Sequence, residues 1–178
     1  QTYAVPATDS NGDKTAVPVK VQYKDATGTV VAEDTINVPV TVVSSTPSKI
    51  VVFEGETPTA EQAKEAVTPG TDGTKGEPTT LPETAGKAGA TDVKVDVPVT
   101  YDNGKLAETV SVPVTVLPKA SGEVEVPKGE SVDKVKEVAK AKAAALVEEA
   151  DFKGKLPTGA TVTVGDITEA VAETLTNE

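Results

Sequence analysis

The valine pattern constrains the fold more than any other feature of the sequence. Valine alternates with polar residues in four segments, at residues 17–23, 36–42, 93–101 and 110–116. An alternation with a period of two predicts strands that bury one face. The segments occur as two pairs with short connections, so they predict two β-hairpins. The sequence therefore favours a mainly β fold.

The connections predict how each hairpin turns. Residues 102–105 read Asp-Asn-Gly-Lys, in which Asn-Gly supplies the positive φ angles of a type I′ turn. The other connection, at residues 24–28, is longer. Each strand contains a Val-Pro-Val motif, and proline has no N–H to donate to a neighbouring strand. We therefore expect each of these prolines at a sheet edge, at a bulge or where its nitrogen faces outward.

The same motifs return at a fixed spacing. Val-Pro-Val-Thr-Val occupies residues 38–42 and again residues 112–116, a shift of 74. The other shared motifs are a Gly-Glu-hydroxyl segment at residues 55–57 and 129–131, shifted by 74, and a Leu-Pro pair at residues 81–82 and 156–157, shifted by 75. A shared spacing over three separate motifs indicates a tandem repeat with a module of about 74 residues.

The repeat divides the chain into one whole module and two halves. Residues 46–118 hold a complete module, residues 1–45 hold the closing hairpin of another, and residues 119–178 hold the opening half of a further one. A half module leaves a strand edge and a valine face uncovered. We hypothesise that the halves complement one another, either within the chain or head to tail between chains. The alternative is that each half folds by itself, with helices covering its exposed face.

Short helices are expected near the start of each module. Thr59 and Gln62 form a capping-box pattern, and this helix should end at Val67. A longer helix should begin at Ser131 or Asp133 and end at residues 154–157. A final helix is expected from Asp166, with an incomplete strand region as the alternative.

The composition excludes most kinds of catalytic and metal-binding site. The sequence contains no His, Cys, Met, Trp or Arg. Imidazole bases, thiolate nucleophiles and zinc ligands are therefore missing, and we expect neither catalytic residues nor a cofactor. A net charge of −11 without Arg argues against nucleic acid as a partner. No apolar run approaches the roughly 18 residues that a membrane helix needs, so membrane insertion is not expected. With only five aromatic residues, the core should be aliphatic and the domains small.

Two segments resemble functional motifs. Asp9, Asn11 and Asp13 place oxygens at alternate positions, as calcium loops do. The glycine falls at the fourth position instead of the sixth and no Glu occupies the twelfth, so a polar turn is the preferred interpretation and the three residues remain the metal candidates. Residues 81–85, Leu-Pro-Glu-Thr-Ala, resemble a sortase signal but lack the apolar segment and basic tail that must follow, which favours a proline-fixed turn.

The order of motifs resembles a known family. Residues 50–58, the Leu-Pro pair at 81–82, the segment 97–104 and the strand 112–116 together are similar to the Rib/alpha-like repeat modules of Gram-positive surface proteins. The turn departs from that family, because Asp102-Asn103 stands where the family has Pro-Asp, and the first hairpin is longer. The resemblance covers residues 46–118 well and each flank as a half.

The resemblance implies tandem immunoglobulin-like β-sandwich modules on an extracellular protein attached to the cell wall. The partners of each module would be its neighbours in the same chain, and the function would be that of a non-catalytic stalk that projects an adhesive region. The alternative is an adhesion or self-assembly module that binds host glycan, host protein or sister chains through open strand edges.

Overall fold

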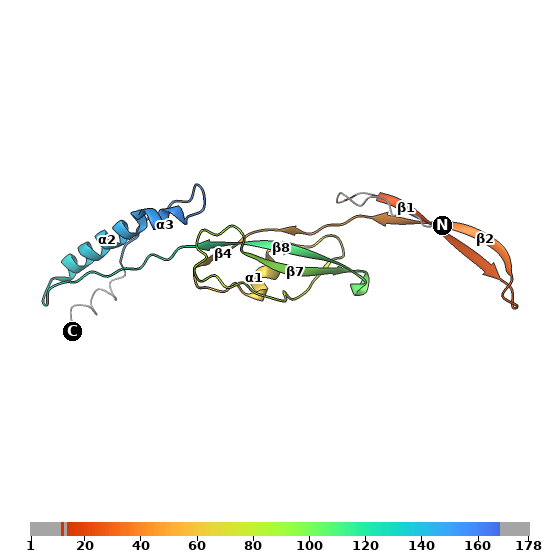
Figure 1. Ribbon diagram of the computed structural model, residues 1–178, viewed down its shortest axis with the longest axis horizontal. Helices are drawn as coiled ribbons and strands as arrows, with labels where there is room; N and C mark the ends of the chain where they lie inside the picture. Colours follow the sequence, from red (N-terminus) through yellow and green to blue (C-terminus); the bar gives the residue numbers. More distant parts are fainter. Residues whose placement is uncertain (1–11, 13, 168–178) are drawn as a thin grey trace.

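The computed structural model describes residue 12 and residues 14–167, which follow an elongated path (Figure 1). A β-hairpin lies at one end, and two helices lie at the other. Between them lies a unit of residues 46–118, which we call the central unit. The β-rich architecture predicted from the valine alternation is confirmed.

The hairpin at the first end consists of β1 (Lys14–Lys24) and β2 (Val30–Thr41), which pair antiparallel. Asp25 organises the connection, because its Oδ1 accepts hydrogen bonds from the Thr27 N–H (2.9 Å) and the Thr29 N–H (3.0 Å). The predicted hairpin is thus confirmed. Its apolar face stays open to solvent, with Ile36 50% exposed.

The central unit contains a four-stranded sheet in the order β4-β8-β7-β6. Its strands are β4 (Ile50–Phe53), β6 (Thr74–Lys75), β7 (Lys94–Tyr101) and β8 (Leu106–Leu117). β7 and β8 form the second predicted hairpin, whereas β4 runs parallel to β8 with Ile50 opposite Val114. A separate two-stranded ladder joins β3 (Thr46–Pro47) to β5 (Val67–Thr68).

The core of the central unit is aliphatic, as the composition predicted. The main cluster of buried residues consists of Ile50, Val52, Ala63, Ala66, Val67, Val93, Val95, Val97, Val99, Val110, Val112, Val114 and Val116. These side chains alternate along β4, β7 and β8, so one face of the sheet is buried and the other is wet. The cluster spans the whole central unit and includes no residue of the hairpin or of the helices at the far end.

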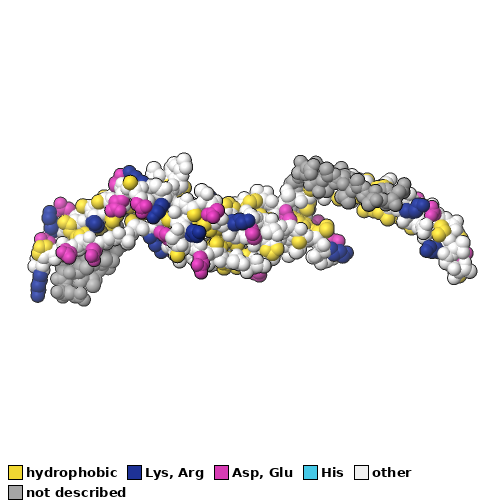
Figure 2. Space-filling view, viewed as in Figure 1, with side chains coloured by type: hydrophobic (Ala, Val, Ile, Leu, Met, Phe, Trp, Pro, Cys, Tyr) yellow, Lys and Arg dark blue, Asp and Glu magenta, His cyan; other side chains and the backbone are white. Residues whose placement is uncertain are grey.

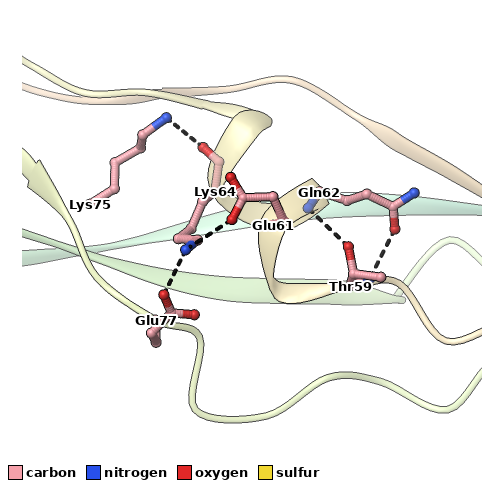
Figure 3. Close-up of polar contacts among 6 residues, drawn as sticks. All are labelled: Thr59, Glu61, Gln62, Lys64, Lys75 and Glu77. Carbon is pink, nitrogen blue, oxygen red and sulfur yellow. Dashed lines mark hydrogen bonds and ion pairs between the residues drawn. The ribbon is translucent and has the colours of Figure 1, made fainter.

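The short helix α1 (Ala60–Glu65) closes one side of this core with Ala63. Its predicted capping box is present, with the Gln62 N–H donating to Thr59 Oγ1 (3.1 Å) and the Thr59 N–H donating to Gln62 Oε1 (2.9 Å) (Figure 3). Lys64 Nζ pairs with Glu61 (3.1 Å) and Glu77 (2.6 Å). The helix ends before the predicted Val67, because Val67 pairs with Pro47 in the β3–β5 ladder.

The strand prolines lie where their missing N–H costs little. Pro113 directly precedes the part of β8 that pairs with β4, and Pro98 directly precedes the part of β7 that pairs with β6. Neither proline nitrogen is therefore needed as a donor in those ladders, as expected, although the Pro98 carbonyl accepts a hydrogen bond from the Gly76 N–H (2.8 Å). The β7–β8 loop, η1 (Asp102–Gly104), has positive φ at Asn103 and Gly104, as predicted, and also at Asp102.

The second end of the molecule carries α2 (Val132–Glu148) and α3 (Ala150–Gly154). Ser131 caps α2 as predicted, accepting a hydrogen bond from the Lys134 N–H (3.3 Å). The prediction of one continuous helix is wrong, because Glu149 adopts an extended ψ of 138° and interrupts it. Lys155, the C-cap of α3, lies against Gly89 of the central unit. The final helix predicted from Asp166 falls mainly on residues 168–178, outside the described residues.

We predict that Val97→Ala lowers the free energy of unfolding by about 2 kcal/mol, because it leaves a cavity in the aliphatic core. Val97 is fully buried. Val51→Ala is the matched control: Val51 lies in the same sheet but is 47% exposed, and its truncation should change the free energy of unfolding by less than about 0.5 kcal/mol. Urea denaturation followed by circular dichroism measures both, and equal losses would contradict the location of the core.

Candidate functional site

The chain makes specific contacts where its two ends meet the central unit. The N-terminal junction lies between the end of β2 and the β7–β8 loop, which points toward the hairpin (Figure 1). The C-terminal junction lies where the chain leaves β8 for the α2–α3 region. These two junctions are the candidate functional site, because they fix how each flank is held against the central unit.

Glu108 is the centre of the N-terminal junction. Its Oε1 accepts hydrogen bonds from the Ser45 N–H (2.9 Å), from the Ser45 hydroxyl (2.5 Å) and from the Tyr101 hydroxyl (2.5 Å). Ser45 Oγ in turn accepts a hydrogen bond from the Gly70 N–H (3.1 Å). Ser45 belongs to the segment that links β2 to β3, so these bonds fasten the linker to the central unit.

Charge strengthens this cluster. Partial burial raises the pKa of the Glu108 carboxyl, but the hydrogen bonds from Ser45 and Tyr101 outweigh it and leave the pKa below its ordinary value. Burial raises the pKa of the Tyr101 phenol, and the bond to Glu108 raises it further. The cluster therefore holds an ionised acceptor and neutral donors at neutral pH, which is the stronger kind of hydrogen bond.

Two glycines let the backbone approach Tyr101. A Cβ atom at Gly70 would lie 2.8 Å from the Tyr101 hydroxyl oxygen and 3.1 Å from the Ser44 carbonyl oxygen. A Cβ atom at Gly73 would lie 2.9 Å from the Tyr101 ring. No other side chain fits beneath the phenol without moving it, so the loop of residues 70–73 is shaped to this junction.

A shallow groove runs beside the N-terminal junction. Residues 40–43 form one side, and Tyr101, Leu106 and Glu108 lie on the other. Its walls are mostly apolar side chains and only one of its acids, Glu108, is held by several donors. Such a groove suits contact between segments.

The C-terminal junction is ionic. Lys119 Nζ lies 3.3 Å from Glu56 Oε1 and 5.9 Å from the centre of the Phe53 ring. Glu56 Oε2 also accepts a hydrogen bond from the Phe53 N–H (3.1 Å). This bond, and then Lys119, lower the pKa of the Glu56 carboxyl. Lys119 thus ties the segment after β8 to the end of β4.

The α3 end of the same junction rests on a close backbone contact. A Cβ atom at Gly89 would lie 2.9 Å from the Lys155 Cα, while the Gly89 N–H donates to the Val116 carbonyl (3.1 Å). Lys155 Nζ pairs with Asp151 (3.0 Å), a contact that raises the pKa of the Lys155 ammonium. Residue 155 is therefore placed beside β8, 36 residues further along the chain than Lys119.

The predicted metal candidates Asp9, Asn11 and Asp13 lie outside the described residues. Between them, the Gly12 N–H donates to the Val42 carbonyl (2.8 Å). Over residue 12 and residues 14–167, no group of three or more acidic side chains is arranged to hold a metal ion. In the sortase-like segment, Thr84 is only 2% exposed and its hydroxyl donates to the Glu56 carbonyl (2.8 Å), so this threonine packs within the fold.

Sequence reasoning missed the Glu108 cluster, although the sequence contains a signal for it. Glu108 lies two residues before the buried Val110 and four before the buried Val112, so its side chain is an acid on the apolar face of β8. A charge in that position requires donors. This position marks Glu108 as unusual, but it does not identify its donor Ser45, which lies 63 residues earlier.

Comparison of the chain with known protein families, with curated proteins and with solved structures gives no match. Within the described part of the chain, neither the length nor the apolarity of any helix is sufficient for crossing a membrane.

We predict that Glu108→Gln lowers the free energy of unfolding at neutral pH by about 1–2 kcal/mol, because the charged acceptor of three hydrogen bonds is lost. The pKa of Glu108 is lower in the folded state, so its contribution is present above the unfolded pKa of about 4.3 and disappears as the pH falls through the folded value.

The two proteins should therefore converge in stability under acid. Glu61→Gln, in the exposed α1 pair, is the control and should cost less than about 0.5 kcal/mol. Denaturation at pH 7 and pH 3 measures these differences. A gap between wild type and Glu108→Gln that persists at pH 3 would contradict the charge-based account.

We also predict that Gly70→Ala loosens the N-terminal junction, since the new methyl group displaces the Tyr101 hydroxyl. NMR relaxation should show the hairpin tumbling more independently of the central unit. Gly165→Ala is the control, because no atom lies within 4 Å of a Cβ at that position. Unchanged hairpin relaxation in Gly70→Ala would show that the junction does not restrain the hairpin.

Proposed function

We propose that this chain is a spacer region of a bacterial cell-surface protein, built from tandem immunoglobulin-like modules that project an adhesive region from a Gram-positive cell wall. The observation that supports this most is the pair of junctions. One central unit with its own core is held at both ends by specific contacts, at Glu108 on one side and Lys119 on the other.

The arrangement favours extension over compaction. The hairpin and the α2–α3 region leave the central unit at opposite ends (Figure 1). Flexible linkers would allow the units to fold back on one another, whereas short linkers bonded to the unit restrict the angle between them. A 74-residue repeat joined in this way adds length with every copy.

Charge supports the same role. Acidic and basic side chains are interspersed along the visible face and neither sign gathers over one element (Figure 2). The net charge of −11 gives neighbouring copies a mutual repulsion that keeps crowded stalks apart. The composition offers less to the adhesion alternative, because glycan sites use aromatic platforms and the chain has five aromatic residues.

A display experiment tests the spacer role. The chain is placed between a cell-wall anchor and an N-terminal epitope, and the control carries a Gly/Ser linker of equal length. We expect more antibody to bind the epitope on the natural chain, because a stiff segment holds it beyond the wall polymers whereas a flexible coil does not. Gly70→Ala should reduce this advantage.

Equal antibody binding with the Gly/Ser linker would reject the spacer role. A saturable hit of the purified chain on an array of glycans and matrix proteins would instead favour the adhesion alternative.

A further inference from the structure

We infer that this chain binds a second copy of itself head to tail. The β1–β2 hairpin of one copy docks on residues 119–167 of the next, which we call the C-terminal segment. Together they complete a unit like the central one. This inference goes beyond the spacer role and does not depend on it, because association in solution is measured without a cell.

The hairpin repeats the geometry of β7–β8. Val17 lies opposite Val38 and Val19 opposite Ile36, just as Val95 lies opposite Val112 and Val97 opposite Val110. The environments differ sharply. Val95, Val97 and Val112 are fully buried and Val110 is 5% exposed, whereas Val19, Ile36 and Val38 are 44%, 50% and 42% exposed. The hairpin therefore exposes to solvent the apolar face that is buried in the core of the central unit.

The C-terminal segment repeats the elements that cover that face in the central unit. Gly55 and Gly129 have nearly the same φ, 85° and 83°. Each ends the same turn, in which the Glu56 N–H donates to Phe53 O (2.9 Å) and the Glu130 N–H donates to Pro127 O (3.2 Å). A capped helix follows both turns, beginning after Thr59 in one case and after Ser131 in the other.

The stretch of the C-terminal segment that corresponds to β4 is not paired with another strand. Residues 124–127 stand where the repeat places Ile50–Phe53, but they are not assigned to a strand. Val124 and Val126 take the places of the buried Ile50 and Val52, and each is 38% exposed. The C-terminal segment thus has the turn, the helix and the apolar residues of an opening half, and it lacks the hairpin that completes one.

The repeat also gives the register of docking. In the central unit, Val51 of β4 lies opposite Thr115 of β8 in a parallel pair. The shift of 74 converts these positions to Glu125 and Thr41. Residues 124–127 of one copy should therefore pair in parallel with residues 40–43 of the next, adding a strand to the exposed edge of β2.

Charge complementarity supports this pairing independently of the apolar faces. The strand registers equate Tyr101 with Tyr23 and Glu108 with Asp34, and the repeat equates Ser45 with Lys119. The Ser45–Glu108 hydrogen bond of the N-terminal junction then corresponds to a Lys119–Asp34 ion pair between copies, for which Lys119 would exchange its Glu56 partner (3.3 Å) for Asp34. Asp34 lies on the same face of β2 as Ile36 and Val38, and in the proposed contact this acid would be paired with a cation.

We assign the partner as a second copy, because the two halves do not meet within residue 12 and residues 14–167 of one chain. They lie at opposite ends of the central unit (Figure 1). An interface between two different surfaces of identical chains does not close on itself unless the rotation forms a ring, so it produces open, growing assemblies.

Sedimentation of the full chain tests the inference, with two variants that each add one negative charge to β2. Val38→Asp changes the apolar face and Asn37→Asp changes the opposite face. We expect the wild type and Asn37→Asp to grow with concentration, and Val38→Asp to associate on the order of a hundredfold more weakly, because docking would bury its carboxylate. A wild type that stays monomeric at millimolar concentration, or two variants that associate equally, would overturn the inference.

Disulfide trapping tests the register and does not depend on how well Val38→Asp folds. The natural chain has no cysteine, so introduced thiols report only on their own positions. Under mild oxidation, the double variant Thr41→Cys with Glu125→Cys should form a ladder of linked chains. The control, Thr27→Cys with Glu125→Cys, moves the first thiol to the hairpin tip and should give little linkage. No ladder, or equal ladders from both pairs, would refute the register.

Discussion

The requirement that a valine face be covered governs the whole structure. A two-stranded hairpin with one apolar face is at best marginally stable in water. In the central unit, β4 pairs in parallel with β8 and α1 closes the side, so both ends of a 73-residue stretch contribute to one core. Each buried valine then stabilises the fold by roughly 1.5–3 kcal/mol before entropy is counted. The β1–β2 hairpin has a matching apolar register, with Ile36 where β8 has Val110, but it lacks these elements, which explains its exposed face.

The two junctions each fix a flanking segment to the central unit, but they use different chemistry. Ser45 and Lys119 occupy equivalent positions in the repeat, yet the first is fixed by hydrogen bonds to Glu108 and the second by an ion pair to Glu56. A serine and a lysine demand different partners, so the surfaces that flank successive units are not interchangeable. In the tandem arrangement that we propose, these side chains would make each unit favour one particular neighbour.

Local patterns determined most of what the sequence could predict. The hairpins, the capping box at Thr59, the positive φ at Asn103 and the aliphatic core all follow from residues close together in the chain. The parallel pairing of β4 with β8 joins segments more than sixty residues apart, and periodicity does not specify such a partner. The break at Glu149 was missed for a related reason: helix propensity continues through it, and the contact of Lys155 with Gly89 is tertiary. Ser45 and Glu108 likewise meet only after folding.

The proposed self-association and the proposed spacer role require the same geometry of this chain. Completion of a half unit by the next copy would reproduce the core and the parallel β4-like strand of the central unit at every contact, and so would extend the axis that the single chain already defines. Long-range repulsion between copies of net charge −11 opposes their approach from the side. At the hairpin and the C-terminal segment, the burial of valine and the Lys119–Asp34 pair would act over a few ångströms, which is shorter than the Debye length of about 8 Å at physiological salt, so salt screens them least. If both proposals hold, lateral contact is disfavoured while end-to-end contact is favoured, and a stiff rod is the assembly that would satisfy both.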